Sequence, residues 1–200
     1  MNLSQKHILF DCDGTLLKSL GFGMDAFNFA LEHVGARPHT PEEIKKFFGQ
    51  SADKIFYHLL GDKKKAEEAY EIYFEFEVNH VSRIHTHAGI VELLDNLKAS
   101  GARMGVVTGR HSRDLELLFN HTKLHHYFEA LVCDDHLSIP KPHPEGLLLV
   151  ATRMNINIKD CYYVGDSVMD IQAAHAAGAK SIAALWDQWA HQEEMERELA

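Results

Sequence analysis

Two aspartates near the start of the chain have a spacing that suits catalysis. Asp11 and Asp13 directly follow the apolar run from His7 to Phe10 and precede Gly14. Residues two apart in an extended segment point to the same side, so the two carboxylates would lie together. Adjacent carboxylates repel unless a cation or a proton separates them. A magnesium ion at Asp11 would keep that side chain ionised as a nucleophile, and Asp13 could act as an acid and then as a base.

A calcium loop and a plain turn are the alternative interpretations of this segment. The calcium loop fails because its glycine falls at position six, whereas Gly14 is the fourth residue counted from Asp11. The plain turn stays open as the structural alternative.

Two further segments carry groups that suit a phosphate. Thr108 and Gly109 offer a hydroxyl and free backbone N–H groups to phosphate oxygens. Lys141 has a proline on either side, and this stiff segment would hold its ammonium still. There it could neutralise both Asp11 and a phosphoryl oxygen.

A pair of aspartates late in the chain completes the candidate site. Asp166 follows an apolar run and opens a helix, where its carboxylate is well placed to bind a hard cation. Asp170 lies four residues on, hence on the same helical face, and could orient Lys141 or a metal-bound water. The alternative is that Asp166 caps the helix and Asp170 favours its dipole.

The elements that must position these residues alternate along most of the chain. Apolar runs predict strands over 7–10, 103–107, 131–133, 162–164 and 181–185, with helices between them over 90–97, 115–119, 147–154 and 171–177. This alternation predicts an α/β fold, a three-layer Rossmann-like core with a parallel sheet. Ligands bind beyond the carboxyl ends of such strands, so we expect the four segments to meet there.

Residues between the first strand and the rest have helical patterns alone. A helix start signal stands at Thr40-Pro41-Glu42-Glu43, and a long helix is expected over 63–81. We therefore expect a discontinuous catalytic core of residues 1–16 and 84–200, interrupted by a helical insert of residues 17–83. The segments Gly21-Phe22-Gly23 and Thr86-His87-Ala88-Gly89 are the expected flexible joints.

The composition narrows the class of partner. A net charge of −9 over 200 residues argues against nucleic acid as a partner. No apolar run has membrane-spanning length, and no signal peptide is expected. The three cysteines have no metal-ligand spacing and are expected to be reduced thiols of a cytoplasmic protein. The fifteen histidines lack zinc spacing and are expected to be solvated or to cap helices.

In chain order, these segments resemble the four motifs of the haloacid dehalogenase superfamily, and the resemblance spans nearly the whole chain. The motifs are Asp11-Cys12-Asp13-Gly14-Thr15, Thr108-Gly109, Lys141-Pro142 and Gly165-Asp166-Ser167-Val168-Met169-Asp170. The helical insert resembles the cap domain of the phosphoglycolate phosphatase-like branch, which includes pyrophosphatases and β-phosphoglucomutase-like proteins. The resemblance implies Asp11 as nucleophile, Asp13 as acid/base, and phosphoryl binding by Thr108 and Lys141. It also implies magnesium held by Asp11, the Asp13 carbonyl and Asp166.

We therefore expect a magnesium-dependent phosphatase that hydrolyses a small phosphate monoester, phosphoglycolate-like or related, through an aspartyl-phosphate. Dehalogenases and phosphonatases of the superfamily lack the second aspartate, which is present here as Asp13. A phosphomutase of the β-phosphoglucomutase type, an inorganic pyrophosphatase and a regulatory module without turnover remain alternatives. We expect a small-molecule phosphate ester as partner, no nucleic acid or membrane, and a monomer or homodimer.

The cap is expected to close over the strand ends and to select the substrate. Its loop from Phe48 to Ser51 would then face the substrate, where Gln50 and Ser51 could hydrogen-bond a leaving group. Lys54 or Lys18 could meet a second negative charge, such as a carboxylate or another phosphate. Lys18 stands where many members of the family that this sequence resembles carry an acid, a departure that bears on the substrate.

Overall fold

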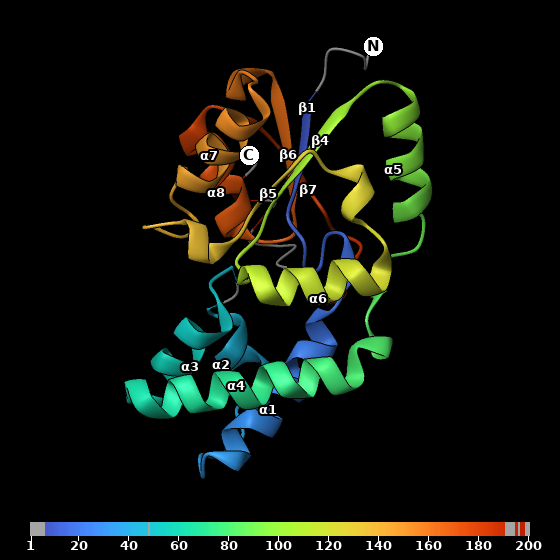
Figure 1. The fold of residues 1–200 in the computed structure, drawn as a ribbon. Helices are drawn as coiled ribbons and strands as arrows, with labels where there is room; N and C mark the ends of the chain where they lie inside the picture. Colours follow the sequence, from blue (N-terminus) through green and yellow to red (C-terminus); the bar gives the residue numbers. More distant parts are fainter. Residues whose placement is uncertain (1–6, 48, 191–194, 196, 199–200) are drawn as a thin grey trace.

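The central sheet lies at one end of the molecule (Figure 1). The structure, a computed structural model, describes residues 7–47, 49–190, 195 and 197–198. Five strands pair in parallel in the order β5-β4-β1-β6-β7. They are β1 (His7–Phe10), β4 (Arg103–Val107), β5 (Ala130–Val132), β6 (Cys161–Gly165) and β7 (Lys180–Ala183). The predicted α/β fold with a parallel sheet is confirmed.

Helices cover both faces of this sheet, which explains why its inner strands are apolar on both sides. On one face lie α5 (Ile90–Ala99) and α6 (Ser112–Thr122), packed with Phe10, Met104 and Val106. On the other lie α7 (Glu145–Met154) and α8 (Val168–Ala177), packed with Leu9 and Val107. Short 3-10 turns link these elements: η3 (His125–Tyr127), η4 (Asp134–His136) and η5 (Ile158–Asp160).

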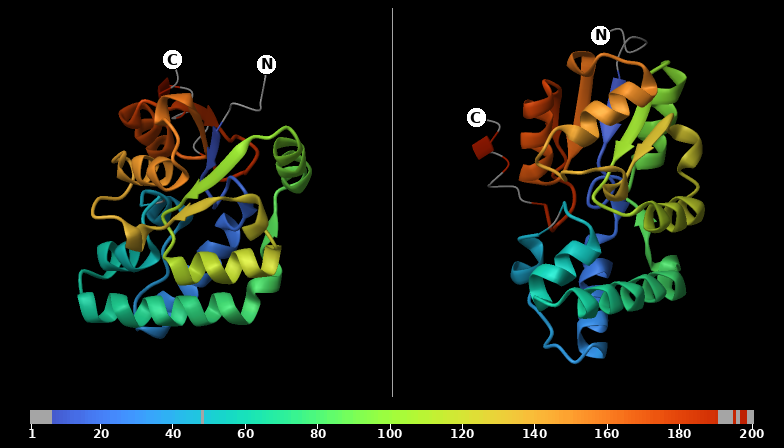
Figure 2. Two further views of the ribbon diagram at one scale, coloured as in Figure 1. Left: turned by 45° about the horizontal axis from the view of Figure 1, so that its top comes forward. Right: turned by 60° about the vertical axis from the view of Figure 1, so that its left-hand side comes forward.

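The predicted helical insert forms a separate block beyond the carboxyl ends of the strands (Figures 1 and 2). It contains α1 (Leu20–His33), α2 (Pro41–Lys45), α3 (Ala52–Leu60), α4 (Lys63–His80) and η2 (Val81–Arg83). Thr40 and Glu43 form a capping box at the start of α2, as their spacing predicts. Aromatic rings hold the block together: the Phe27 centroid lies 5.0 Å from that of Phe56 and 4.8 Å from that of Tyr73.

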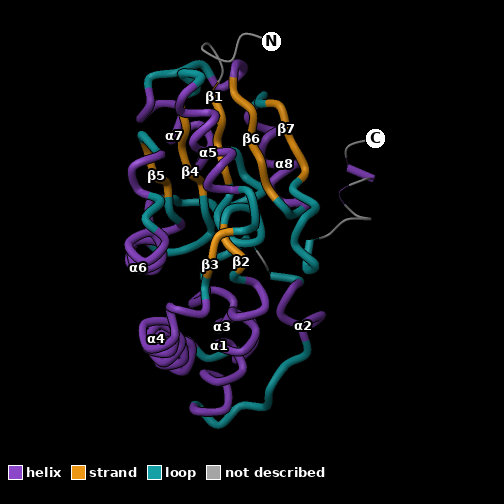
Figure 3. Tube along the Cα trace, turned by 90° about the vertical axis from the view of Figure 1, so that its right-hand side faces the viewer, coloured by secondary structure: helices purple, strands orange, loops and turns teal. Residues whose placement is uncertain are grey.

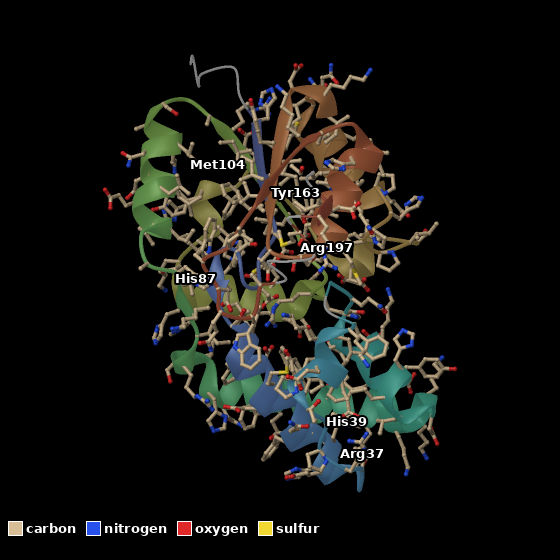
Figure 4. The ribbon with its side chains drawn as sticks, turned by 180° about the vertical axis from the view of Figure 1, so that it is seen from behind. Arg37, His39, His87, Met104, Tyr163 and Arg197 are labelled. Carbon is tan, nitrogen blue, oxygen red and sulfur yellow. The ribbon has the colours of Figure 1, made fainter. Side chains whose placement is uncertain are left out.

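Two short strands connect the helical block to the sheet. β2 (Leu17–Lys18) pairs antiparallel with β3 (His85–Thr86), and this ribbon lies between the two blocks in Figure 3. His87 follows the ribbon on the core side (Figure 4), and its backbone N–H donates to the Leu16 carbonyl at 3.0 Å. The joint predicted at Gly21-Phe22-Gly23 is wrong, because these residues lie inside α1. Burial of Leu20, Phe22 and Met24 there outweighs the helix cost of glycine.

No helix in the described part of the chain combines the length and the apolar character needed to cross a bilayer.

The aromatic core of the helical block provides a test of its packing. We expect Phe56→Ala, at a fully buried position, to lower the free energy of unfolding by about 3–5 kcal/mol, because it removes a ring and leaves a cavity. Tyr57→Ala, at the next position but 52% exposed, should change that free energy by no more than about 0.5 kcal/mol. Urea denaturation measures both, and equal losses would contradict this packing.

Candidate active site

Four loops bring polar side chains to the carboxyl edge of the sheet, where they face the helical block. A cavity of about 90 Å³ lies between them. The core contributes Asp11, Asp13, Gly109, Arg110, Lys141, Asp166, Ser167 and Asp170 to its lining, and the helical block contributes Ser19, Leu20, Gly23, Phe27, Gly49, Gln50, Ala52, Ile55 and Tyr73. These include the predicted residues Asp11, Asp13, Gly109, Lys141, Asp166 and Asp170, which thus meet at this cavity.

Lys141 connects the nucleophile candidate to the last motif. Its Nζ donates to Asp11 Oδ1 at 2.7 Å and to Asp170 Oδ1 at 2.7 Å, and all three side chains are buried. Tyr163, which lies in the sheet in Figure 4, places its hydroxyl 3.3 Å from the same Nζ. Ser167 donates to the other oxygen of Asp170 at 2.5 Å. The hydrogen bonds to Asp11, Asp170 and Tyr163 therefore fix the position of the Lys141 ammonium.

Three carboxylates share this space. One oxygen each from Asp11, Asp166 and Asp170 lies within 4.8 Å of the others. Burial raises the pKa of Asp11 to about 7, with Lys141 opposing the shift and Asp170 adding to it. Burial also raises the pKa of Asp166 well above its usual value, and the charge of Asp11 adds to that shift. One ammonium does not balance this negative charge, so the cluster is suited to a further cation.

The donor set fits the magnesium ion that the family resemblance implies. Asp11 and Asp166 offer hard oxygen ligands, and the backbone carbonyl of Asp13 belongs to the same loop. Gly14, with φ +75°, allows Asp166 to approach this loop, since a Cβ at that position would collide with the Asp166 carboxylate. The residues that could hold the ion are therefore Asp11, Asp166 and the Asp13 carbonyl.

Asp13 has a different set of partners. The Arg110 guanidinium donates from Nε to Asp13 Oδ2 at 2.8 Å and from Nη2 to Oδ1 at 2.9 Å, and the Ser19 hydroxyl also donates to this carboxylate. Burial works to raise the pKa of Asp13, but Arg110 and Ser19 together hold it below its usual value. The two aspartates of the first motif are therefore held by two different cations.

Arg110 also reaches the helical block. Its Nη1 donates to both carboxylate oxygens of Glu77 on α4 at 3.0 Å, and the Tyr73 hydroxyl donates to Glu77 at 3.0 Å. Burial raises the pKa of the fully buried Glu77 to about 7, and Arg110 opposes this.

The sequence analysis missed Arg110 and Glu77. For Arg110 the signal was present, as a cation directly after Thr108-Gly109 at a strand end. Glu77 has no such signal, because it is one of several acids along α4.

Of the two phosphate-binding candidates after β4, Gly109 lines the cavity and Thr108 does not. Thr108 is buried, and its Oγ1 accepts a hydrogen bond from the Arg110 backbone N–H at 3.2 Å. A Cβ at Gly109 would collide with the carbonyl oxygen of Gly49 in the helical block. The two blocks therefore touch directly beside the cavity, backbone against backbone.

Of the four residues predicted to contact the substrate, only Gln50 lines the cavity. Gln50 lines the cavity, and its Oε1 lies 3.1 Å from His58 Nε2. Ser51 is fully buried at the start of α3 but does not line the cavity. Phe48, in the same predicted loop, lies outside the described residues.

Neither Lys54 nor Lys18 lines this cavity, and their contact with a substrate stays a prediction. Lys54 Nζ pairs with Asp134 Oδ2 at 2.7 Å, because a nearly buried carboxylate of η4 lies within its reach. Lys18 is exposed on β2, on the opposite side of the ribbon from the buried Leu17. Among the described residues, the cationic side chains that line the cavity are Arg110 and Lys141.

Comparison with known proteins agrees with this arrangement. The sequence model of the haloacid dehalogenase-like hydrolase family matches residues 8–184, so the chain belongs to that family. It is 28% identical to pyrophosphatase PpaX of Bacillus mycoides, over 90% of this chain and 83% of that one. It is 29% identical to phosphoglycolate phosphatase 1 of Pseudomonas aeruginosa, over 88% and 68%.

The fold also matches solved structures. The crystal structure of a hydrolase from Pseudomonas syringae superposes with a TM-score of 0.83 at 24% identity, covering 96% of this chain and 90% of that one.

An ion pair between the blocks predicts a pH-dependent stability. His111 Nε2 lies 2.8 Å from Asp53 Oδ1, and the hydrogen bond to Asp53 raises the pKa of His111, with Asp114 and Asp134 adding to the shift. Partial burial opposes ionisation of Asp53, but His111 brings the pKa of Asp53 down to about 2. A raised histidine pKa stabilises the fold below its unfolded value of about 6.5, and this stabilisation is lost as pH rises through the folded value.

We therefore expect Asp53→Asn to be more destabilising near pH ~6 than near pH ~9. The difference in the free energy of unfolding should stay below about 1 kcal/mol, because both side chains are partly exposed to solvent. Glu71→Gln is the matched control, since its partner Arg113 keeps its charge over this range. Urea denaturation at both pH values checks this, and a pH-independent effect of Asp53→Asn would contradict it.

Proposed function

We propose that this protein is a magnesium-dependent phosphatase that hydrolyses a small phosphate monoester, phosphoglycolate-like or related, through an aspartyl-phosphate. The observation that carries the proposal is the buried cluster of Asp11, Asp166 and Asp170 around Lys141 at the carboxyl edge of the sheet. Membership of a hydrolase family and relatives named as phosphatases support it.

In the first proposed step, Asp11 attacks the phosphorus of the ester in line with the leaving oxygen. Lys141 already holds Asp11 Oδ1 at 2.7 Å, so the other carboxylate oxygen is available for attack. Asp13 is the proposed acid: it must take up a proton before this step, against the effect of Arg110 and Ser19 on its pKa, and it donates that proton to the leaving oxygen as the bond from phosphorus to that oxygen breaks. The products are a free alcohol and phosphoryl-Asp11.

In the second proposed step, Asp13 removes a proton from water, and the water oxygen attacks the phosphorus of phosphoryl-Asp11. The bond between phosphorus and the carboxylate oxygen breaks, which restores Asp11 and releases inorganic phosphate. Lys141, the Thr108 hydroxyl and the Gly109 backbone N–H would hold the phosphoryl oxygens. Asp170 fixes Lys141 for that role. Bound magnesium would supply the positive charge that lowers repulsion between Asp11 and the phosphate.

Residues 17–83 would act as a cap over this chemistry. The helical block lines one side of the cavity with Phe27, Gln50 and Ile55, so a leaving group bound beside Asp11 would contact these side chains. Closure would exclude bulk water during the first step. We further propose a cytoplasmic monomer or homodimer that acts on a small-molecule phosphate ester without a nucleic-acid or membrane partner; the acidic net charge of −9 supports the exclusion of nucleic acid.

Inorganic pyrophosphate is the second candidate substrate. The same small cavity supports it, because pyrophosphate is compact and Arg110 and Lys141 both line the space. A mutase of the β-phosphoglucomutase type, which would hold a sugar phosphate, is the third candidate. A screen of two-carbon and three-carbon phosphate esters, pyrophosphate and hexose phosphates, with analysis for released phosphate and for isomers, separates the three.

The nucleophile provides the most direct test. We expect Asp11→Asn to lower kcat by at least about 10³-fold, because the amide has the size of the carboxylate but cannot form an acyl phosphate. The circular dichroism spectrum should be unchanged. Steady-state phosphate release measures the effect, and activity within tenfold of wild type would refute this role of Asp11.

The metal requirement gives a second test. We expect EDTA to abolish phosphate release, magnesium to restore it, and calcium to fail to do so. Magnesium imposes a tight octahedron on oxygen ligands, whereas the calcium shell is larger and more variable. Full activity after exhaustive dialysis against EDTA would disprove the metal site.

A further inference from the structure

The ribbon of β2 and β3, which joins the helical block to the core, has an exposed face that carries two basic side chains. Lys18 and His85 are register partners in this ribbon, so they lie directly opposite each other on the same face. Both are exposed, whereas Leu17 on the other face is buried. Within residues 7–47, 49–190, 195 and 197–198, neither side chain has a hydrogen-bond or ionic partner. Their donor groups are therefore free to bind a ligand.

Two adjoining hollows lie beside this face of the ribbon, with volumes of about 280 and 370 Å³. Both lie where the ribbon meets the segment 186–189 that follows β7, and we call the two together the joint groove. Its lining includes Lys18, Arg83, His85, Trp186, Asp187 and Trp189. None of these six residues lines the active-site cavity, so the joint groove is a separate feature of the surface.

The acid that lines the joint groove already has a neighbour of its own. Asp187 is buried, and its Oδ2 lies 3.2 Å from Nε2 of His87, which is also buried where the ribbon returns to the core (Figure 4). Arg83 pairs with Asp25 at the surface. The basic groups of the joint groove that remain unpaired are those of the ribbon face. An anion can bind there despite the net charge of −9, because the local charge decides.

A fixed aromatic ring lies in the same groove. The Trp186 indole Nε1 donates to the Thr15 carbonyl at 3.0 Å, and the ring packs edge-on against His87 with centroids 6.5 Å apart. These two contacts hold the indole in one orientation, yet Trp186 is 47% exposed. The groove therefore offers an apolar surface in a set position, on which a flat ring can stack.

We propose that the joint groove binds a small organic anion, a flat ring that carries a phosphate or carboxylate group. The anionic group accepts hydrogen bonds from Lys18 and His85, and the ring stacks on Trp186. Such a ligand contacts both the ribbon that carries the helical block and a segment of the core. Its binding is therefore linked to any change in their relative position. The site lies outside the proposed active site and does not depend on the proposed function.

Tryptophan fluorescence tests this site directly, because the chain has two tryptophans and both line the joint groove. The probes are adenosine monophosphate and phenylacetate, titrated without added magnesium, with excitation at the red edge of the indole band. We expect a saturable change in emission with one or both probes. Comparison of the two apparent Kd values then identifies the preferred anionic group.

Three variants locate the binding. Lys18→Gln and His85→Gln should each raise the apparent Kd of the preferred probe by about 10-fold, because each removes a charge-assisted hydrogen bond. Trp186→Ala should raise it by about 10-fold as well, since the stacking surface is lost. Trp189 remains as the reporter in that variant. Both ribbon variants change exposed side chains, so they stay informative if Trp186→Ala folds poorly.

Lys64→Gln is the matched control. It removes the charge of an exposed lysine in the first turn of α4, at the opposite end of that helix from Arg83 and the joint groove. The apparent Kd should be the same as in the wild type. An equal loss of affinity in Lys64→Gln would show that the anion responds to overall charge, and it would overturn the inference.

The remaining outcomes also decide the question. The absence of a saturable change with both probes would overturn the inference, and so would an unchanged Kd in both Lys18→Gln and His85→Gln, which would place the binding elsewhere. Adenosine and phenylethanol lack the anion, and inorganic phosphate lacks the ring. If any of these three binds as tightly as the preferred probe, the assigned class of ligand is wrong. Because emission is measured rather than turnover, a protein that hydrolyses no phosphate ester would refute the proposed function and leave this test intact.

Discussion

The rest of the structure depends on three buried carboxylates that lie close together at the carboxyl edge of the sheet. Asp11, Asp166 and Asp170 bring carboxylate oxygens within 4.8 Å of one another, and Lys141 pairs directly with two of them. Such a cluster costs free energy unless cations offset it, so the surroundings must supply positive charge and fixed donors. The parallel sheet makes the cluster possible, because it aligns the ends of β1 and β6 as direct neighbours.

Two cations divide the two aspartates of the first motif between them. Lys141 belongs to the core and holds Asp11, the residue proposed to carry the phosphoryl group. Arg110 lies where the blocks meet and holds Asp13, the residue proposed to move the proton. Asp11 is thus held within the core, whereas Asp13 is connected to the helical block through Arg110 and Glu77. This asymmetry suits an enzyme in which substrate enters and leaves while the core stays fixed.

The sequence predicted the parts of this arrangement that are encoded locally. One short segment of sequence encodes a strand end, its polar residues and the helix that follows. The local hydrophobic pattern therefore predicts the sheet and the placement of Asp11, Thr108, Lys141 and Asp166 after its strands. Contacts across the blocks have no local pattern. Arg110 is 97 residues from Asp13 and 33 from Glu77. Lys54 was expected at the substrate, yet it pairs with Asp134, 80 residues away in the sequence. No periodic pattern in the sequence indicates this pair.

The direct backbone contact between the two blocks beside the cavity limits how the proposed cap could select a substrate. At Gly109 any side chain would collide with the Gly49 carbonyl, so the two blocks approach there through backbone atoms of fixed shape. Side chains of the insert shape the cavity where they line it, as Gln50, Phe27 and Ile55 do. Two of these three side chains are apolar, whereas Gln50 and Ser19 add polar groups to the lining beside the cations of the core. Under the proposed function, a leaving group would therefore meet apolar side chains of the insert on one side and charged groups of the core on the other.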